Sequence, residues 1–518
     1  MKRKAGAIAA GHPETAKAAG EMLQSGGNAF DAVLAAHLAA CVAEPVLTSL
    51  GGGGFLIART SAGEQTLYDF FVQTPLQMKS RSSEFFPISA DFGEVQQEFH
   101  IGPGSIATPG TVKGIFEIHS DLCSMPLKEI ATPAIELARN GVEMNAFQAG
   151  IFEIIKPIFL SYEMPKSIYG SHKNQNELIR QGEILKLPEL ADFLEELICE
   201  GESWFYGGYV ADQISSICRE NGGHLSRKDL QKYSVIKRKP LEVTYRDATI
   251  SINPPPGSGG ILIGFALKLM EKLNYGDFSP GSEEALTLLA KVQELTDHAR
   301  IDAFVDETIG KSEDVILDPD FIEMYKKKIQ PDLLSPKGTT HISVIDKDGN
   351  AAGLSTSNGE GSGVMIPGTG MMLNNMLGEE DLNPHGFYQW PENQRMTSMM
   401  APGILERKNG NKIIFGSGGS NRIRTAILQV ILNLVDFGMP LEQAISFPRI
   451  HFEKGLLNAE HGFEEKVLSA ISKKFLNHKI WNEKSLFFGG THAASGGPDG
   501  YSGYGDPRRG GVSLTVDA

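Results

Sequence analysis

Two adjacent threonines follow a glycine at the start of a segment that otherwise predicts a β-hairpin. Thr339 and Thr340 come directly after Gly338. A threonine hydroxyl is a weak nucleophile until a base takes its proton. If the chain is cut before Thr339, the α-amine of that residue becomes the base, because its pKa of about 8 suits proton transfer at neutral pH. A glycine before the bond gives the backbone freedom that an intramolecular N-to-O acyl shift requires. The pattern predicts a threonine nucleophile released by self-cleavage.

The predicted hairpin would bring further hydroxyl groups to Thr339. The runs HISVID and NAAGLSTS flank KDG at 347–349, which is a strong turn signal. A turn closed there places residue 339 beside the hydroxyl residues 355–357. These hydroxyls would hold Thr339 by hydrogen bonds. The alternative is that threonine and serine serve here as ordinary strand residues, and the pattern alone leaves both interpretations open.

A glycine-rich loop later in the chain fits the second part of such a site. The segment KIIF-GSGGSN-RIRTAIL predicts a strand, a loop and the start of a helix. Backbone N–H groups of Gly418, Gly419 and Ser420 would then lie at the positive end of a helix dipole and could stabilise an oxyanion. A phosphate site or a plain turn are the alternatives. No GxxxxGK[ST] motif occurs, and no GxGxxG stands in a convincing βαβ unit.

The elements that must position these residues differ along the chain. The first third predicts a helix over Pro13–Gln24, a buried helix over 29–44 and a strand within 50–60. The middle, from about 110 to 335, is expected to be mostly helical. PPPGSGG at 254–260 predicts a rigid turn whose glycines open a helix.

Composition sets limits on the class of protein. The chain has 518 residues, 41% apolar and 21% charged, which is ordinary for a soluble globular protein. A net charge of −15 argues against a nucleic-acid partner, and no apolar run is long enough to predict a membrane span. The start MKRKAGAIAAGHPETAK is a poor secretory signal, so we expect a cytoplasmic protein. The scattered cysteines predict neither a zinc site nor a disulfide framework, and no metal or organic cofactor is expected. The four are Cys41, Cys123, Cys199 and Cys218.

These segments together resemble the γ-glutamyltranspeptidases, N-terminal-nucleophile enzymes that cut themselves into a large and a small subunit. The most specific segment is TTH-x-SV-x-DKDGNA, beginning at Thr339. The other segments that carry the resemblance fall in order along nearly the whole chain. They are GGNAFDA (26–32), GGGGF (51–55), GSIATPGTVKG (104–114), PPPGSGG (254–260), DPDF (318–321), LNN (373–375) and GDPRR (505–509).

The resemblance implies an α+β fold, a four-layer αββα sandwich of the N-terminal nucleophile hydrolase type. It implies cleavage between Gly338 and Thr339, so that residues 1–338 and 339–518 become large and small subunits of one precursor and of one catalytic core. Thr339 is the implied nucleophile, and Ser357 falls where the family keeps a second threonine bonded to it. Gly419 and Ser420 fall at the oxyanion pair, with serine in place of the second glycine. Further homo-oligomerisation is left open.

The implied substrate-binding positions depart from the family pattern. Phe71 stands where an arginine grips the γ-glutamyl α-carboxylate. In the family, two hydroxyl residues also bind that carboxylate, and the corresponding residues here are Ser398 and Met399. Gly359 stands in place of an asparagine. A carboxylate without its arginine loses one of the strongest bidentate contacts available, so reaction type transfers better than glutamyl specificity.

The acid that binds the α-amine in the family is Glu379 here, with Glu380 and Asp381 as alternatives. Segment 383–395 lies where some relatives have a lid. Its aromatic residues would wall an apolar acyl site, or would simply pack within a surface loop. They are Phe387, Tyr388 and Trp390.

We therefore expect a self-processing N-terminal threonine amidohydrolase and acyltransferase that cleaves γ-glutamyl amides such as glutathione through an acyl-enzyme. Its partner would be a small-molecule or peptide amide. The nearest alternative is an acylase with the same machinery and a non-glutamyl substrate, which Phe71 and Met399 favour. A non-catalytic binding relative is opposed by the intact TTH and GSGGS segments. A nucleotide-binding α/β enzyme is opposed by the lack of a phosphate-loop lysine.

Overall fold

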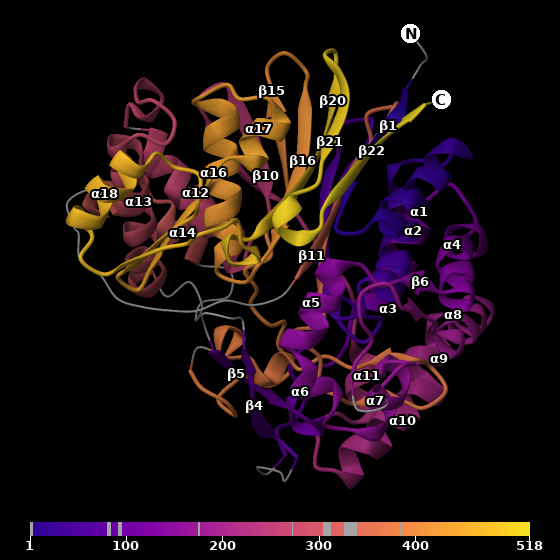
Figure 1. Cartoon of the computed structure of the whole chain (residues 1–518). Helices are drawn as coiled ribbons and strands as arrows, with labels where there is room; N and C mark the ends of the chain where they lie inside the picture. The colour runs from indigo at the N-terminus through magenta and orange to yellow at the C-terminus, as the bar shows by residue number, and fades with distance from the viewer. Residues whose placement is uncertain are drawn as a thin grey trace.

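Two stacked β-sheets form the centre of the molecule, and helices cover both outer faces (Figure 1). The structure is a computed structural model that describes residues 4–79, 84–91, 96–174, 177–271, 273–303, 312–325, 339–383 and 385–517. The expected four-layer α+β arrangement is confirmed, because helices α1 and α2 pack on one sheet and α12 and α16 on the other.

The first sheet combines strands from both sides of residue 338. Strand β11 lies in its interior and pairs antiparallel with β1 and β12. The order across the sheet is β22 (Val512–Asp517), β1 (Lys4–Ala10), β11 (Thr340–Asp346), β12 (Ala351–Ser357), β2 (Gly53–Arg59), β3 (Gln65–Phe70) and β8 (Ile236–Arg238).

The second sheet is also built from both parts of the chain. Strand β16 faces β11 and β12 across the interior. The order is β21 (Gly500–Tyr504), β20 (Gly490–Gly497), β16 (Lys412–Gly418), β15 (Gly403–Arg407), β10 (Ala248–Ile252) and β9 (Leu241–Tyr245).

The helices beside the first sheet follow the sequence signals closely. Helix α1 spans Pro13–Gln24 as predicted, and α2 spans Ala29–Ala43 with Asn28 forming a capping box. Every residue of α2 is buried, because the helix lies between α1, α4 and the sheet. The helices that extend this side are α3 (Thr111–Leu122), α4 (Leu127–Asn140), α5 (Ala146–Ile154), α8 (Pro188–Glu200), α9 (Glu202–Gly207), α10 (Tyr209–Glu220) and α11 (Arg227–Lys232).

On the opposite side, the predicted helices after the PPPGSGG and GSGGSN segments are confirmed. Helix α12 begins at Ser258, and α16 begins at Arg422. Figure 1 shows this group on the far side of the second sheet from α1 and α2. The group comprises α12 (Ser258–Glu271), α13 (Glu283–Asp302), α16 (Arg422–Val435), α17 (Leu441–Ser446) and α18 (Glu465–Lys474).

Strand β11 is buried on both faces, and its side chains alternate between two hydrophobic clusters. Ile342 and Val344 belong to the cluster under α1 and α2, whereas Ile345 belongs to the cluster that includes the space between the sheets. Because side chains alternate along a strand, odd-numbered positions from 339 onward face the second sheet. The fold thus directs Thr339 toward β16.

The expectation of a mostly helical middle segment is right in its helices but missed the short strands β6 (Val142–Glu143) and β7 (Ile184–Leu185) and strands β8 to β10. Strands β8 and β9 lie at sheet edges, and β10 lies next to β9. Short strands like these carry weak periodicity, so the long helical patterns around them dominate the prediction. Among the described helices, none combines the length and the apolar character needed to cross a membrane.

Candidate active site

The predicted hairpin is confirmed and fixes the position of Thr339. Thr340 pairs with Thr356 across β11 and β12, so Thr339 lies opposite Ser357. Thr339 and Ser357 are each 5% exposed. Gly338 lies outside the described residues, and with it the expected bond of cleavage.

The predicted cluster of three hydroxyls is only partly formed. Thr356 faces away, and its Oγ1 lies 3.1 Å from Oγ1 of Thr48. The Ser355 hydroxyl lies 2.8 Å from Nδ1 of His341. Burial lowers the pKa of His341 well below its usual value, so the ring is a neutral structural group. Of the three hydroxyls, Ser357 is the one that shares a pocket with Thr339.

That pocket contains most of the residues predicted for the site. The empty space between its lining residues is about 380 Å³, a volume that includes open solvent at the pocket mouth. Among its described lining residues there is no arginine, lysine or histidine, so its fixed charges are carboxylates. The lining residues are Phe71, Thr339, Ser357, Met376, Glu379, Asp381, Leu382, Ser398, Met399, Met400, Ser420 and Ile423.

The glycine-rich loop lies against Thr339, as the sequence predicted. A Cβ on Gly418 would come within 1.9 Å of the Thr339 carbonyl oxygen, so only glycine allows this approach. The carbonyls of Gly419 and Ser420 accept from the first amides of α16. Within the described parts of the chain, no acceptor is recorded for the amide N–H groups of Gly419 and Ser420. Two donors near a helix start are thus left for an oxyanion.

Arg509 is a neighbour of Thr339 that the sequence reasoning did not assign. Its Nη1 donates to the Thr339 carbonyl at 3.4 Å. The guanidinium is 4% exposed, and burial lowers its pKa to about 10. The GDPRR segment contributes to the family resemblance, but no local sequence pattern indicates that Arg509 reaches Thr339.

Phe71 occupies the place of the expected arginine and belongs to the core. It is 1% exposed and stacks on Phe55 with ring centroids 5.4 Å apart. Its amide donates to Oδ1 of Asp69 at 3.1 Å. Behind it, Arg395 donates to the Phe71 carbonyl and, at 2.6 Å, to the carbonyl of Ser234. This arginine is tied to backbone behind the pocket and does not line it.

The loop with Ser398 and Met399 is held by the PPPGSGG segment. The carbonyl of Ser398 accepts from the amide of Ser258 at 2.9 Å, where α12 begins. The side chain of Asn253 donates to the Met400 carbonyl at 2.8 Å. The Ser398 hydroxyl accepts from the Met400 amide at 3.1 Å. The rigid turn therefore positions one wall of the pocket.

Of the candidate acids, Glu379 and Asp381 line the pocket and Glu380 does not. Glu379 is 4% exposed. Gly359 lies directly behind it: a Cβ there would be 2.5 Å from Oε1 of Glu379 and 2.1 Å from Oδ1 of Asn375. A side chain at position 359 would therefore displace the acid.

The hypothesis that the aromatics of 383–395 wall the acyl site is wrong for this pocket, whose described lining includes none of them. Phe387 packs on Phe85 and His100, with ring centroids 5.2 and 4.4 Å away. Tyr388 contacts Phe85, and Trp390 contacts His224. The alternative of a surface loop with packed aromatics is confirmed.

A buried carboxylate lies on the other face of β11. Glu44 accepts from Oγ1 of Thr340 at 2.9 Å and from Oγ1 of Thr15 at 2.8 Å. It is fully buried, and desolvation raises its pKa to about 7. The sequence reasoning treated this residue only as the end of a helix.

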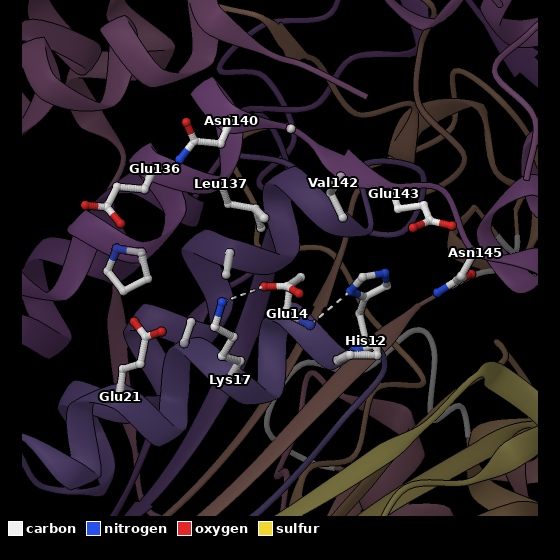
Figure 2. Close-up of a pocket in the computed structure, with 15 residues that line it drawn as sticks. His12, Glu14, Lys17, Glu21, Glu136, Leu137, Asn140, Val142, Glu143 and Asn145 are labelled. Carbon is white, nitrogen blue, oxygen red and sulfur yellow. Dashed lines mark hydrogen bonds and ion pairs between the residues drawn. The ribbon is translucent and has the colours of Figure 1, made fainter. Parts of the chain in front are cut away.

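A wider pocket lies between α1 and the end of α4 and shares no residue with the pocket at Thr339. Figure 2 shows Glu14 between Lys17 and His12 in it. Lys17 pairs with Glu14 at 3.4 Å, and the Glu14 amide donates to Nδ1 of His12 at 3.2 Å. Its other acids, Glu21, Glu136 and Glu143, face solvent to varying extents, and its described lining includes no serine, threonine or cysteine.

All four cysteines are free thiols. The described residues include no cluster of three or more histidine, cysteine or acidic side chains arranged to hold a metal.

Comparison with known proteins shows the relatives of the whole chain. The family model for gamma-glutamyltranspeptidase matches residues 15–516. The glutathione hydrolase proenzyme of Escherichia coli (strain K12) is 29% identical over 555 residues, covering 98% of this chain and 91% of that protein. The acylase ACY 1 proenzyme of Pseudomonas sp. (strain SE83) is 29% identical, covering 96% and 90%. The crystal structure of cephalosporin acylase from Bacillus halodurans matches in fold with a TM-score of 0.83 and 22% identity, covering 99% and 96% of the two chains.

Proposed function

The chain belongs to the gamma-glutamyltranspeptidase family of enzymes, and on that premise we propose that it is a self-processing amidohydrolase with Thr339 as its N-terminal nucleophile. The observation that carries the proposal is the meeting of Thr339, Ser357 and the Gly418–Ser420 loop at one pocket. Cleavage before Thr339 divides one precursor into the portions 1–338 and 339–518.

In the proposed mechanism, Oγ1 of Thr339 attacks the carbonyl carbon of an amide while the free α-amine takes the hydroxyl proton. The amide N–H groups of Gly419 and Ser420 stabilise the negative oxygen of the tetrahedral intermediate. The α-ammonium then gives its proton to the leaving amine, and an ester to Thr339 remains. Water, or a second amine, attacks this ester by the same steps in reverse and frees the threonine.

Two acyl donors are candidates. The first is a γ-glutamyl amide such as glutathione, in keeping with the family. The second is an acyl group without the α-carboxylate, and the pocket favours it. Phe71 and Met399 replace polar carboxylate ligands, Arg395 is tied to backbone, and the charges that line the pocket, Glu379 and Asp381, repel a carboxylate. Glu379 suits a donor that carries an ammonium group.

The first experiment is the intact mass of the purified protein beside Thr339→Ala. We expect two fragments that meet at Gly338–Thr339 in the wild type and one uncut chain in the variant. Thr340→Ala is the matched control, because its hydroxyl faces Glu44 instead of the pocket. A wild type that stays uncut and inactive after long incubation contradicts the proposal.

The donor is tested with four p-nitroanilides that share one chain length. The γ-glutamyl group carries both ammonium and carboxylate, 4-aminobutyryl only the ammonium, glutaryl only the carboxylate, and butyryl neither. We expect kcat/KM to be highest for 4-aminobutyryl and butyryl, and lowest for glutaryl. A preference of more than about 10-fold for γ-glutamyl over 4-aminobutyryl, worth about 1.4 kcal/mol, would favour the glutamyl donor instead.

A further inference from the structure

The backbone of Ser420 has a conformation that favours glycine. Its φ is 49°, and it follows Gly419 with φ 123°. Residues with a Cβ are held in this left-handed region only where the surrounding structure compensates. Ser420 also carries one of the two N–H groups proposed for the oxyanion and lines the pocket with Thr339. The loop therefore needs a contact that keeps this strained residue in place.

Asp381 supplies such a contact. The Ser420 hydroxyl donates to Oδ2 of Asp381 at 2.6 Å, a length typical of a charge-assisted hydrogen bond. The turn that carries Asp381 is itself fixed, because the buried side chain of Asn383 donates to the carbonyls of Met376 at 3.1 Å and Glu379 at 2.7 Å. The strained serine is thus tied to a rigid anchor.

We propose that Asp381 is a positioning residue that, through the hydroxyl of Ser420, holds the oxyanion loop in its working conformation. The inference rests on the proposed acyl-transfer function. It also accounts for the serine that stands in place of the family's second glycine. Glycine adopts a φ of 49° without help, whereas serine requires an anchor, so Ser420 and Asp381 form one unit.

The rival role for Asp381 is direct binding of the donor's ammonium, because it lines the same pocket as Glu379. The two roles predict different dependence on residue 420. An anchor becomes superfluous when position 420 is glycine. A substrate ligand is needed whatever stands at position 420.

A double-mutant cycle separates these roles. Asp381→Ala, Ser420→Gly and the double variant are compared with wild type, on 4-aminobutyryl and butyryl p-nitroanilides, after intact mass has measured the processed fraction. We expect Asp381→Ala to lower kcat about 10- to 100-fold on both anilides, with KM within about 2-fold, since a misdirected oxyanion donor acts on the transition state. Ser420→Gly keeps the backbone N–H and serves as the reference, and the double variant should match Ser420→Gly in kcat.

An equal loss from Asp381→Ala in both backgrounds overturns the inference, and so does a loss confined to KM for the 4-aminobutyryl substrate. Should Asp381→Ala fail to fold, Asp381→Asn replaces it in both backgrounds. Its side-chain oxygen still accepts from the Ser420 hydroxyl, so we expect a smaller loss of kcat, again only where residue 420 is serine. If the proposed function itself is wrong, the result is different: the wild type stays uncut in the mass measurement and is inactive on both anilides.

Discussion

Thr340 and Glu44 are joined by a hydrogen bond of 2.9 Å, although 296 positions separate them in the sequence. The bond ties the start of β11 to the end of α2, on the face of the strand opposite the pocket. Thr15 donates to the other oxygen of the same carboxyl. No cation is recorded in an ion pair with Glu44 among the described residues, so the two hydroxyls hold a carboxyl group in a site that disfavours its charge.

The contribution of Glu44 to stability should therefore fall as pH rises from about 4.5 to about 7. Desolvation raises the pKa of Glu44 from 4.5 to about 7. In this window the Glu44 carboxyl keeps a proton in the folded chain that it loses in the unfolded chain, so for this group each rise in pH favours unfolding. Glu44→Gln removes the titrating proton. It should be more stable than wild type above pH 7, by up to about 3 kcal/mol, and similar near pH 4.5. Urea unfolding at four pH values measures this difference.

The matched control for this experiment is Glu14→Gln, whose carboxyl is about one-third exposed and pairs with Lys17. It measures the effect of removing a partly exposed, paired carboxylate from the same side of the molecule. Parallel stability curves for wild type and Glu44→Gln would show that the buried carboxyl does not titrate in this window.

Replacing Arg509 should slow the reaction at Thr339. The guanidinium donates to the Thr339 carbonyl, and a Cβ on Gly419 would lie 3.3 Å from its Nη2. A hydrogen bond from a charged group is worth about 1.5–3 kcal/mol, so Arg509→Met should lower kcat about 10- to 100-fold in the processed enzyme. Arg509→Lys keeps the positive charge but loses the planar, two-pronged donor geometry of the guanidinium, so its kcat should lie between those of wild type and Arg509→Met. Rates equal to wild type in both variants, with cleavage intact, would contradict this positioning role.

The parts of the site that could be predicted from sequence depend on short-range signals. The turn at 347–349 sets the register that places Thr339 opposite Ser357, and a glycine-rich segment before an apolar helix predicts the loop at Gly419. Turn type and helix start are local properties, so a few neighbouring residues determine them.

The parts that were missed depend on contacts between distant segments. Arg509 lies between β21 and β22, and it reaches Thr339 because β20 pairs with β16 at Gly418, next to Thr339. No local pattern encodes that path. The aromatics of 383–395 were misplaced for the same reason. Their partner Phe85 directly precedes β4 (Phe86–Asp91), and their partner His100 lies within β5 (Gln96–Ile101). The position of these strands relative to the loop is a property of the folded chain.

A methyl group at position 359 should disturb the acid of the pocket. Gly359 has φ 64°, and its added Cβ would lie 2.5 Å from Oε1 of Glu379. Gly359→Ala should raise KM for the 4-aminobutyryl anilide by about 10-fold or more, while KM for the butyryl anilide changes little, because only the former uses Glu379. Steady-state kinetics on the two substrates tests this.

Gly368→Ala is the matched control, because Gly368 has a similar φ of 70° and no atom within 4 Å of the added Cβ. Both variants lose about 1 kcal/mol or more of stability from backbone strain, but only the first should change KM. An equal change of KM in both would mean that strain, and not the displaced acid, is responsible.

An arginine at position 71 should shift the donor preference toward γ-glutamyl. Phe71 lines the pocket at the position where the resemblance implies an arginine for the α-carboxylate, and Glu379, the proposed partner of the amine, lines the same pocket. Phe71→Arg loses the stacking on Phe55 and buries a charge, so it should unfold more readily by several kcal/mol. The ratio of kcat/KM for γ-glutamyl over 4-aminobutyryl is independent of the folded fraction, and it should rise about 10-fold. Phe71→Met, uncharged and flexible, should leave the ratio unchanged. If the ratio stays constant in Phe71→Arg as well, the loss of arginine at this position does not determine which acyl group the enzyme accepts.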